Sequence, residues 1–200
     1  MSVRCVLATA NPDKAREILA IVAELGEIEL VERPADVPDV EETGETLEEN
    51  ARLKAVALRR ATNTASIADD TGLEVDALGG DPGVRSARYA GEQATYEENV
   101  DKLLGELEGR TDRRARFATV ALLSLPDGTE LWARGVVEGA IAEHPVGEGG
   151  FGYDSVFIPM EGDGRTFAQM EPGEKNEVSH RTRALRSLAE MMAARGLFDG

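Results

Sequence analysis

Residues 4–14 read Arg-Cys-Val-Leu-Ala-Thr-Ala-Asn-Pro-Asp-Lys, an apolar run followed at once by residues that start helices. The run 4–8 is typical of a short buried strand. Asn11 is a preferred N-cap residue, and Pro12 suits the first position of a helix. The helix that follows repeats its apolar residues at a period near 3.6 and meets Gly26, which suits a helix stop. A strand therefore leads directly into a helix.

The rest of the chain continues this alternation of strands and helices. Capping boxes at Thr46 and Thr95 predict amphipathic helices over about 46–60 and 95–107. Pro126-Asp127-Gly128 separates two β-rich runs, which predicts a hairpin. Helices mixed with a hairpin indicate an α/β fold with a mixed sheet. The remaining elements are expected as strands at 28–31, 66–68, 115–125, 130–137 and 156–158, and as a helix at 180–195.

Three segments are expected to interrupt the regular elements. The strand at 66–68 is expected to stop at Asp69-Asp70-Thr71-Gly72, because charged and turn-forming residues follow it. Dense, irregularly spaced glycines at 73–94 indicate a functional loop or a run of turns. The acidic, proline-bearing stretch 32–45 indicates a loop at the edge of a cleft.

Composition restricts the class of protein. A chain of 200 residues suits one sizeable domain, and the single cysteine, Cys5, excludes a disulfide framework and a multi-cysteine zinc site. The formal net charge of -16 opposes binding to nucleic-acid polymers and to anionic membranes. The sequence lacks a signal-peptide core, and no apolar run reaches the roughly 20 residues of a membrane span. We therefore expect a cytoplasmic protein without nucleic-acid or membrane partners.

The turn from Thr9 to Lys14 is a candidate phosphate site. Its residues Thr9, Ala10, Asn11, Pro12 and Asp13 lead into a helix. Backbone N–H groups at a helix start attract anions, and Lys14 adds a positive charge one turn in. The turn lacks the glycines of a P-loop, so an ordinary capped turn with a solvated lysine is the alternative.

Two acidic pairs are candidate ligands for Mg²⁺. Asp69-Asp70 follows a buried strand, where open α/β sheets place ligands, and Glu41-Glu42 lies in a loop. Mg²⁺ takes one or two protein carboxylates and completes its octahedron with water and phosphate oxygens. A capped turn at Asp69-Asp70, and chance pairing among 38 acidic residues, are the alternatives. Lys54 lies four residues after Asn50, so both side chains share one helix face. That face could line a cleft, or it could be the exposed face of an amphipathic helix.

Two later segments could contact a base. The glycine-rich residues 147–150 lead into Phe151, Gly152, Tyr153 and Asp154. The faces of aromatic side chains stack on bases, so this segment could contact a base. A hairpin whose aromatics enter the core is the alternative. His180 and Arg181 fall in the first turn of the last helix, where positive charge opposes the helix dipole. A ligand that accepts hydrogen bonds would explain them; a structural histidine is the alternative.

Taken together, these segments strongly resemble the inosine/xanthosine triphosphate pyrophosphatases, the HAM1-like family of house-cleaning enzymes. The resemblance covers nearly the whole chain in the order of the family. It rests on six blocks: Thr9-Ala10-Asn11 with Lys14, Glu41-Glu42-Thr43-Gly44 with Glu49-Asn50 and Lys54, Ala68 to Leu73, Ser86-Ala87-Arg88-Tyr89, Gly149 to Asp154, and Ser179-His180-Arg181.

The resemblance implies a long mixed β-sheet flanked by helices, with two lobes of a single domain, 1–200, around a substrate cleft. It also implies a homodimer that uses Mg²⁺ to split ITP, dITP or XTP into the nucleoside monophosphate and pyrophosphate. These purines have lost an exocyclic amine. Hydrogen-bond donors of the protein can recognise the 6-oxo group of these purines. The same donors would find no acceptor in ATP, where adenine carries an amino group at that position.

The resemblance also implies a role for each site residue. Asp70 would accept the proton of the attacking water and contact the metal, with Glu42 as the second metal ligand; Glu41 or Asp69 could complete that site instead. Thr71 would contact the substrate. Thr9 to Lys14 and Lys54 would hold the phosphate chain. The residues expected around the base and sugar are Phe151, Gly152, Tyr153, Asp154, Lys175, His180 and Arg181.

Three other functions remain open from the sequence. A Maf-like nucleotide pyrophosphatase would share the architecture and reaction with another base preference, but the 151–154 block and Ser179-His180-Arg181 argue against it. A nucleotide sensor would bind an altered triphosphate without turnover, and it would have no need of Asp70 as a base. An acidic interaction protein would gain no stability from ITP with Mg²⁺.

Overall fold

The computed structural model describes residues 2–198 as two compact units. Of the described residues, the first comprises 2–70, 119–135 and 181–198, and the second comprises 71–118 and 136–180. One mixed seven-stranded sheet contributes to both, in the order β2-β1-β3-β5-β6-β7 with β4 paired to β3. Strands β3 (Ser66–Val75), β5 (Arg114–Ser124) and β6 (Glu130–Ile141) each contribute residues to both units. The predicted α/β class and mixed sheet are confirmed.

In the first unit, two parallel strand pairs set the geometry. Strand β1 (Val3–Leu7) pairs in parallel with β2 (Ile28–Val31) and with the start of β3. Parallel neighbours need crossover connections, which helices α1 (Pro12–Leu25) and α2 (Leu47–Thr62) provide. The boundaries of β1, β2, α1 and α2 were predicted within two residues, and so was the start of β3.

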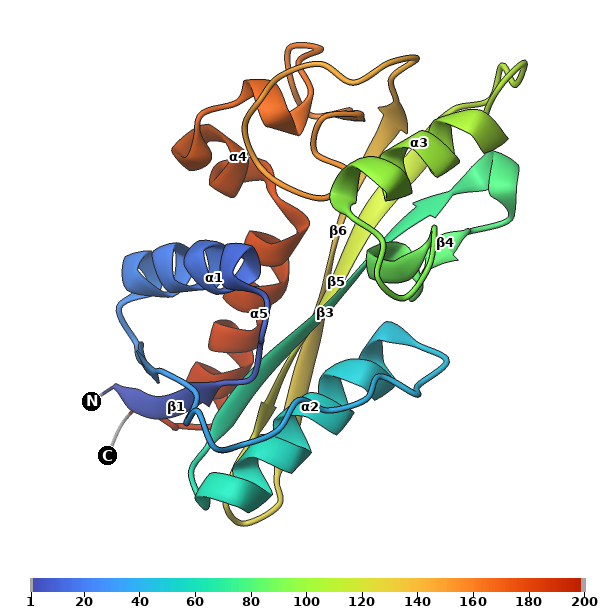
Figure 1. Ribbon diagram of the computed structural model, residues 1–200. Helices are drawn as coiled ribbons and strands as arrows, with labels where there is room; N and C mark the ends of the chain where they lie inside the picture. Colours follow the sequence, from blue (N-terminus) through green and yellow to red (C-terminus); the bar gives the residue numbers. More distant parts are fainter. Residues whose placement is uncertain (1, 199–200) are drawn as a thin grey trace. The chain divides into compact units, whose positions relative to one another are not determined.

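Helices cover both faces of the strands of the first unit (Figure 1). Helices α1 and α5 (His180–Ala194) pack on the face that carries Ile67, around a cluster that includes Ile18, Ile21 and Leu185. Helix α2 covers the other face, where the Ser66 hydroxyl donates to the Ala55 carbonyl at 2.6 Å. Alternate residues of β3 therefore face different helices, which decides where its carboxylates lie.

Local capping fixes where these helices start and stop. The Asn11 side chain accepts hydrogen bonds from the N–H groups of Asp13 and Lys14, and Gly26 ends α1 in the left-handed conformation at φ 72°. The Thr46 and Glu49 side chains form the predicted capping box of α2. Such caps satisfy backbone groups that a helix terminus leaves without an intrahelical partner.

The second unit has its own aromatic core. It contains β4 (Pro82–Gly83), α3 (Tyr96–Glu106), β7 (Phe157–Pro159) and α4 (Pro172–Val178). Short 3₁₀ turns occupy Asp76–Leu78, Ser86–Arg88 and Phe167–Gln169. Phe117 packs against Phe157 with ring centroids 4.7 Å apart, and Phe157 packs against Phe167 at 5.1 Å. The capping box of α3 at Thr95 is confirmed.

Three expectations about the elements are wrong. Strand β3 does not stop at Asp69-Asp70 but continues to Val75, because cationic side chains meet both buried carboxylates and remove the reason to end the strand. Residues 73–94 are not only turns, since they include the end of β3 and strand β4. Strand β6 extends to Ile141, four residues beyond the predicted end, and helix α4 was not predicted.

Candidate active site

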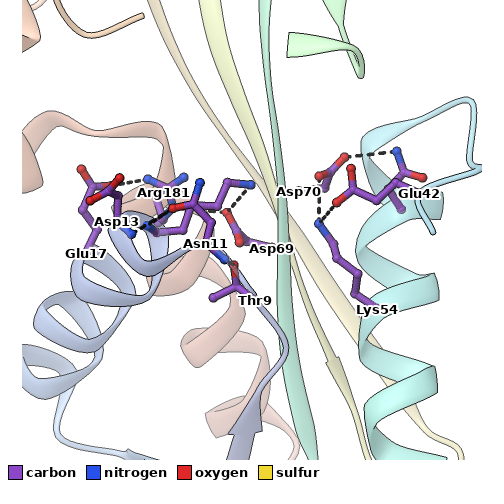
Figure 2. Close-up of polar contacts among 11 residues, drawn as sticks. Thr9, Asn11, Asp13, Glu17, Glu42, Lys54, Asp69, Asp70 and Arg181 are labelled. Carbon is purple, nitrogen blue, oxygen red and sulfur yellow. Dashed lines mark hydrogen bonds and ion pairs between the residues drawn. The ribbon is translucent and has the colours of Figure 1, made fainter. Parts of the chain in front are cut away.

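Two adjacent carboxylates of β3 form the centre of the candidate site. Asp69 and Asp70 point to opposite faces of the strand, as Figure 2 shows, because side chains alternate along an extended chain. Both are buried, with exposed fractions of 1% and 4%. A buried carboxylate stays charged only where cations or hydrogen-bond donors compensate it. The two faces supply different partners.

On the face toward α2, Asp70 lies in a network with Lys54. The Lys54 ammonium lies 2.9 Å from Asp70 Oδ1 and 2.8 Å from Glu42 Oε1, so one cation bridges two carboxylates. The Asn50 amide donates to Asp70 Oδ2 at 3.3 Å. Asn50 and Lys54 share the helix face that their spacing predicted, and that face is turned inward. Asn50 was left out of the predicted site residues, although this spacing pointed to it.

Asn50 also positions the loop that carries Glu42. The Gly44 N–H donates to Asn50 Oδ1 at 2.8 Å. A Cβ at Gly44 would lie 2.6 Å from that oxygen and 2.7 Å from Glu49 Cβ, so the position requires glycine. The acidic loop is therefore held closely against the start of α2.

The electrostatics of this face keep Lys54 charged and Asp70 basic. Burial lowers the pKa of Lys54, but Asp70, Asp69 and Glu42 outweigh burial and leave the pKa above its usual value. Burial raises the pKa of Asp70, Lys54 and Lys14 oppose that shift, and the net change is upward. A raised pKa makes a carboxylate a better proton acceptor near neutral pH.

On the opposite face, Asp69 contacts two cationic side chains, one from α1 and one from α5. The Arg181 Nε donates to Asp69 Oδ2 at 3.2 Å, and the Lys14 ammonium lies 3.6 Å from the same oxygen. Arg181 also donates to Glu17. Burial would raise the pKa of Asp69, but Lys14, Arg181 and Lys54 together hold it well below the usual range. Glu17 was not predicted; its place three residues after Lys14, on the same helix face, was the available signal.

The predicted phosphate turn lies at the start of α1, beside this cluster. The Asn11 side chain accepts from Asp13 N at 2.9 Å and Lys14 N at 3.2 Å, and Thr9 Oγ1 accepts from Asn11 N at 3.2 Å. Ala10 and Pro12 are exposed. The turn is a capped helix start that carries Lys14 next to Asp69.

In the second unit, Asp154 organises the predicted aromatic loop. Its Oδ2 accepts from the Phe151 N–H at 2.9 Å and from the Lys175 ammonium at 2.6 Å, and Lys175 is buried. The same ammonium lies 5.0 Å from the centroid of the Phe151 ring. Gly150 and Gly152 adopt positive φ of 70° and 63°, which allows the tight turn. The half-buried Phe151 ring also lies 5.9 Å from that of Tyr96.

Tyr153 and His180 lie inside the second unit. Tyr153 is buried, its hydroxyl donates to the Ser86 carbonyl at 2.9 Å, and burial raises its pKa, so the phenol keeps its proton. The His180 ring stacks on Phe117 with centroids 4.7 Å apart. The interpretation of Tyr153 as a core aromatic and of His180 as a structural histidine therefore has support, but neither contact bears on substrate binding.

The predicted site residues divide between the two units. Ion pairs and hydrogen bonds join Glu42 and Asp70 through Lys54, and they bring Lys14 and Arg181 together at Asp69. In the second unit they join Phe151 and Lys175 through Asp154. His180 and Arg181 are neighbours in sequence but belong to different units. The first unit holds Thr9 to Lys14, Glu42, Lys54, Asp70 and Arg181, and the second holds Thr71, Phe151 to Asp154, Lys175 and His180.

The carboxylate oxygens around Lys54 are suitable ligands for a hard divalent cation. Carboxylate oxygens of Glu42 and Asp70 already flank one positive charge, the Lys54 ammonium. Within residues 2–198, no group of three or more His, Cys, Asp or Glu side chains is arranged to hold a metal ion. Mg²⁺ needs only one or two protein carboxylates when phosphate oxygens and water complete its shell. Two carboxylates therefore fit Mg²⁺ in the presence of a phosphate ligand.

Within the same described range, no helix has both the length and the apolar composition of a membrane span.

Comparison with known proteins gives consistent results along nearly the whole chain. The chain is 44% identical over 192 residues to the dITP/XTP pyrophosphatase of Bacillus subtilis, covering 94% of this chain and 96% of that protein. It is 47% identical over 194 residues to the protein of the same name from Streptomyces avermitilis, with the same two coverages.

Solved structures show the same relationship. The Ham1 protein of Coxiella burnetii matches with a TM-score of 0.86 and 40% identity, over 96% of this chain and 99% of that one. The Staphylococcus aureus Ham1 protein matches with a TM-score of 0.84 and 41% identity, at the same coverages. The profile of the Ham1 family matches residues 5–191. The resemblance seen in the sequence is confirmed, and the chain belongs to the Ham1 family.

Proposed function

We propose that this protein hydrolyses ITP, dITP and XTP to the nucleoside monophosphate and pyrophosphate, with Mg²⁺ as cofactor. Relatives named dITP/XTP pyrophosphatase, 44% to 48% identical over more than nine-tenths of the chain, support the reaction and the substrate class. The observation that carries the proposal is the network of the buried Asp70 and Asn50 with the partly buried Lys54 and Glu42, beside the start of α2. This group combines a basic carboxylate with fixed positive charge, which hydrolysis of a phosphoric anhydride needs.

In this mechanism Asp70 is the general base. A water molecule attacks the α-phosphorus in line with the bond to the bridging oxygen, and Asp70 takes its proton. The bond from the α-phosphorus to the bridging oxygen breaks, and pyrophosphate leaves. Burial supports the assignment because it raises the pKa of Asp70. Lys54 and Asn50 fix the direction of the carboxylate through hydrogen bonds at 2.9 Å and 3.3 Å.

Glu42 and Asp70 would hold the magnesium ion. When bound, Mg²⁺ neutralises charge on phosphoryl oxygens and polarises the phosphorus toward attack. The positions of these two carboxylates on either side of Lys54 support this assignment, and Asn50 contributes by fixing the loop 42–44.

Positive side chains of the first unit would stabilise the phosphate chain and the leaving pyrophosphate. Lys54 lies beside Asp70, and Lys14 lies beside Asp69, whose lowered pKa keeps it charged. We propose that Thr9 to Lys14 contact the phosphates through Lys14 and the start of α1, and that Thr71 contacts the substrate. Fixed charges of this kind act where negative charge develops during the reaction.

The base and sugar would contact Phe151 to Asp154, Lys175, His180 and Arg181. We propose that Phe151 supplies the stacking face, because it is the half-buried aromatic of the loop. Selection for a 6-oxo purine then follows from donors that would face the amino group of adenine. Tyr153 and Asp154 are buried, so they contribute mainly by shaping this loop. We also propose that the two units are lobes of a single domain and that the protein is cytoplasmic. We further propose that it is a homodimer, and light scattering, which measures the molar mass, checks this oligomeric state.

Product analysis tests the proposal. The purified protein is incubated with Mg²⁺ and, in parallel, with ITP, XTP, dITP, ATP and GTP, and the products are separated by ion-exchange chromatography. Monophosphate and pyrophosphate from the first three substrates support the proposal. Equal turnover of all five would contradict the substrate class, and binding of ITP without any product would favour a nucleotide sensor.

A further inference from the structure

Ser86 belongs to a segment, Ser86 to Arg88, that the proposed mechanism does not use, yet its buried side chain connects two strands. Its hydroxyl oxygen accepts from the Leu73 N–H at 2.8 Å and its hydroxyl donates to the Gly83 carbonyl at 2.6 Å. Leu73 lies in β3, two residues beyond Thr71, and pairs with Gly83 of β4. The turn at Ser86 is therefore fixed to the end of the strand that carries Asp70 and Thr71.

The backbone leaves little freedom at this junction. A Cβ at Gly72 would lie 2.6 Å from the Gly83 carbonyl oxygen and 2.9 Å from its carbon. These are backbone atoms, which cannot rotate away as a side chain would. Strand β3 and the turn that begins at Gly83 are thus in close contact, and Ser86 adds two hydrogen bonds to that contact.

The carbonyl group of Ser86 reaches the aromatic loop 147–154. It accepts from the Tyr153 hydroxyl at 2.9 Å, and the two residues are 67 positions apart in sequence. Tyr153 lies between Gly152, at φ 63°, and Asp154, which accepts the Phe151 N–H. A glycine-rich loop has many conformations to lose. The buried Tyr153 hydroxyl, two residues after Phe151, therefore adds to the hydrogen bond between Phe151 and Asp154 in restricting the ring.

We propose that Ser86 and Tyr153 form a positioning link that ties the base-contacting loop to the end of β3. Through this link the Tyr153 hydroxyl sets the place of Phe151 relative to Thr71 and needs no substrate contact of its own. The inference rests on the proposed function, because it assigns how the base end of that site is held. It adds Ser86 to the residues that determine specificity.

A pair of tyrosine variants tests the link. Tyr153→Phe removes the hydroxyl that donates to Ser86 and keeps the ring. Tyr89→Phe is the comparison variant, because the Tyr89 hydroxyl donates to Glu106 Oε2 of α3 at 2.7 Å and makes no bond to Ser86. Both variants lose one tyrosine hydrogen bond, which is buried for Tyr153 and part-buried for Tyr89. Only the Tyr153 bond joins the loop 147–154 to Ser86, so only its loss should change the dynamics of that loop.

Two measurements separate the variants. Loss of one buried hydrogen bond shifts the equilibrium between the closed and the open state of the segment it holds by about fivefold to thirtyfold toward the open state. We expect amide hydrogen exchange of residues 149–154 to accelerate by that factor in Tyr153→Phe and to stay unchanged in Tyr89→Phe. We also expect the ratio of kcat/KM for ITP to that for ATP to fall only in Tyr153→Phe, mainly through a higher KM for ITP.

The outcomes distinguish this inference from the proposed function. Equal exchange at 149–154 in both variants, or an unchanged ITP to ATP ratio in Tyr153→Phe, would overturn the link. A wild-type protein that does not hydrolyse ITP would instead refute the proposed function, and the exchange experiment would still decide whether Tyr153 anchors the loop.

Discussion

The buried ion pair between Lys175 and Asp154 allows a quantitative prediction. The side chains are only 6% and 5% exposed, and the ammonium lies 2.6 Å from Asp154 Oδ2. Lys175→Met keeps an apolar chain of similar length and removes the charge. Asp154 then remains buried without its ammonium, and removal of one partner of a buried pair costs about 3–5 kcal/mol.

The lower end of that range applies here, because Asp154 keeps the hydrogen bond from the Phe151 N–H at 2.9 Å. A loss of about 3 kcal/mol lowers the Tm of a chain this long by about 6–12 °C. Urea denaturation and scanning calorimetry at pH 7 measure both quantities. Because the pair is shielded from solvent, the loss should change little between low and high salt.

Two further variants make the reasoning refutable. Arg165→Met is the control in the same unit, because Arg165 is 38% exposed and its partners Glu174 and Asp163 are 49% and 59% exposed. Each of these surface pairs should contribute at most about 1 kcal/mol. The double variant Asp154→Asn, Lys175→Met should be less destabilised than Lys175→Met alone, because no buried charge remains. A loss below about 1 kcal/mol in Lys175→Met, or strict additivity in the double variant, would refute the reasoning.

Three further predictions concern the first unit. Gly44→Ala should lower the free energy of unfolding by about 1–3 kcal/mol and also reduce turnover, because the added Cβ would lie 2.6 Å from Asn50 Oδ1 and displace the loop that carries Glu42. Gly105→Ala is the control: a Cβ there would meet open space beside α3, so this variant should lose no stability. Lys54→Met should lower kcat for ITP by about 10²-fold or more, because it removes the ammonium group that lies between the carboxylates of Glu42 and Asp70. Steady-state kinetics measure the change, and a fall in kcat of less than tenfold would contradict this prediction. Burial raises the pKa of the Cys5 thiol to about 12, so at pH 8 the thiolate is absent and Ellman's reagent should react only after unfolding in urea; one fast equivalent from native protein would exclude a buried thiol.

Local signals in the sequence were sufficient for most of the fold. Asn11 and Pro12 start α1 as predicted because capping depends on neighbouring residues only. The hairpin turn at Pro126-Asp127-Gly128 is confirmed for the same reason: Leu125 N donates to Thr129 O at 2.8 Å across it. Helix α4 escaped prediction because its seven residues are too few to show an apolar period.

The site depended on partners that are distant in sequence. Asp69 and Asp70 suggested the end of a strand because two adjacent charges rarely lie inside a sheet. Their compensation comes from Lys54, Lys14 and Arg181, and the last lies 112 positions after Asp69. Spacing placed Asn50 and Lys54 on one helix face, but it could not reveal that this face turns inward. The Tyr153 contact with Ser86 likewise required the folded chain.

The central claim is that water attacks the α-phosphorus with Asp70 as base. Hydrolysis of ITP with Mg²⁺ in ¹⁸O-labelled water, followed by mass spectrometry of both products, tests it most directly. The account predicts one ¹⁸O atom in the monophosphate and none in pyrophosphate, with turnover lost in Asp70→Asn and retained in Asp101→Asn, whose side chain is exposed on α3. Label in pyrophosphate, release of diphosphate with orthophosphate, or full turnover by Asp70→Asn would contradict the account.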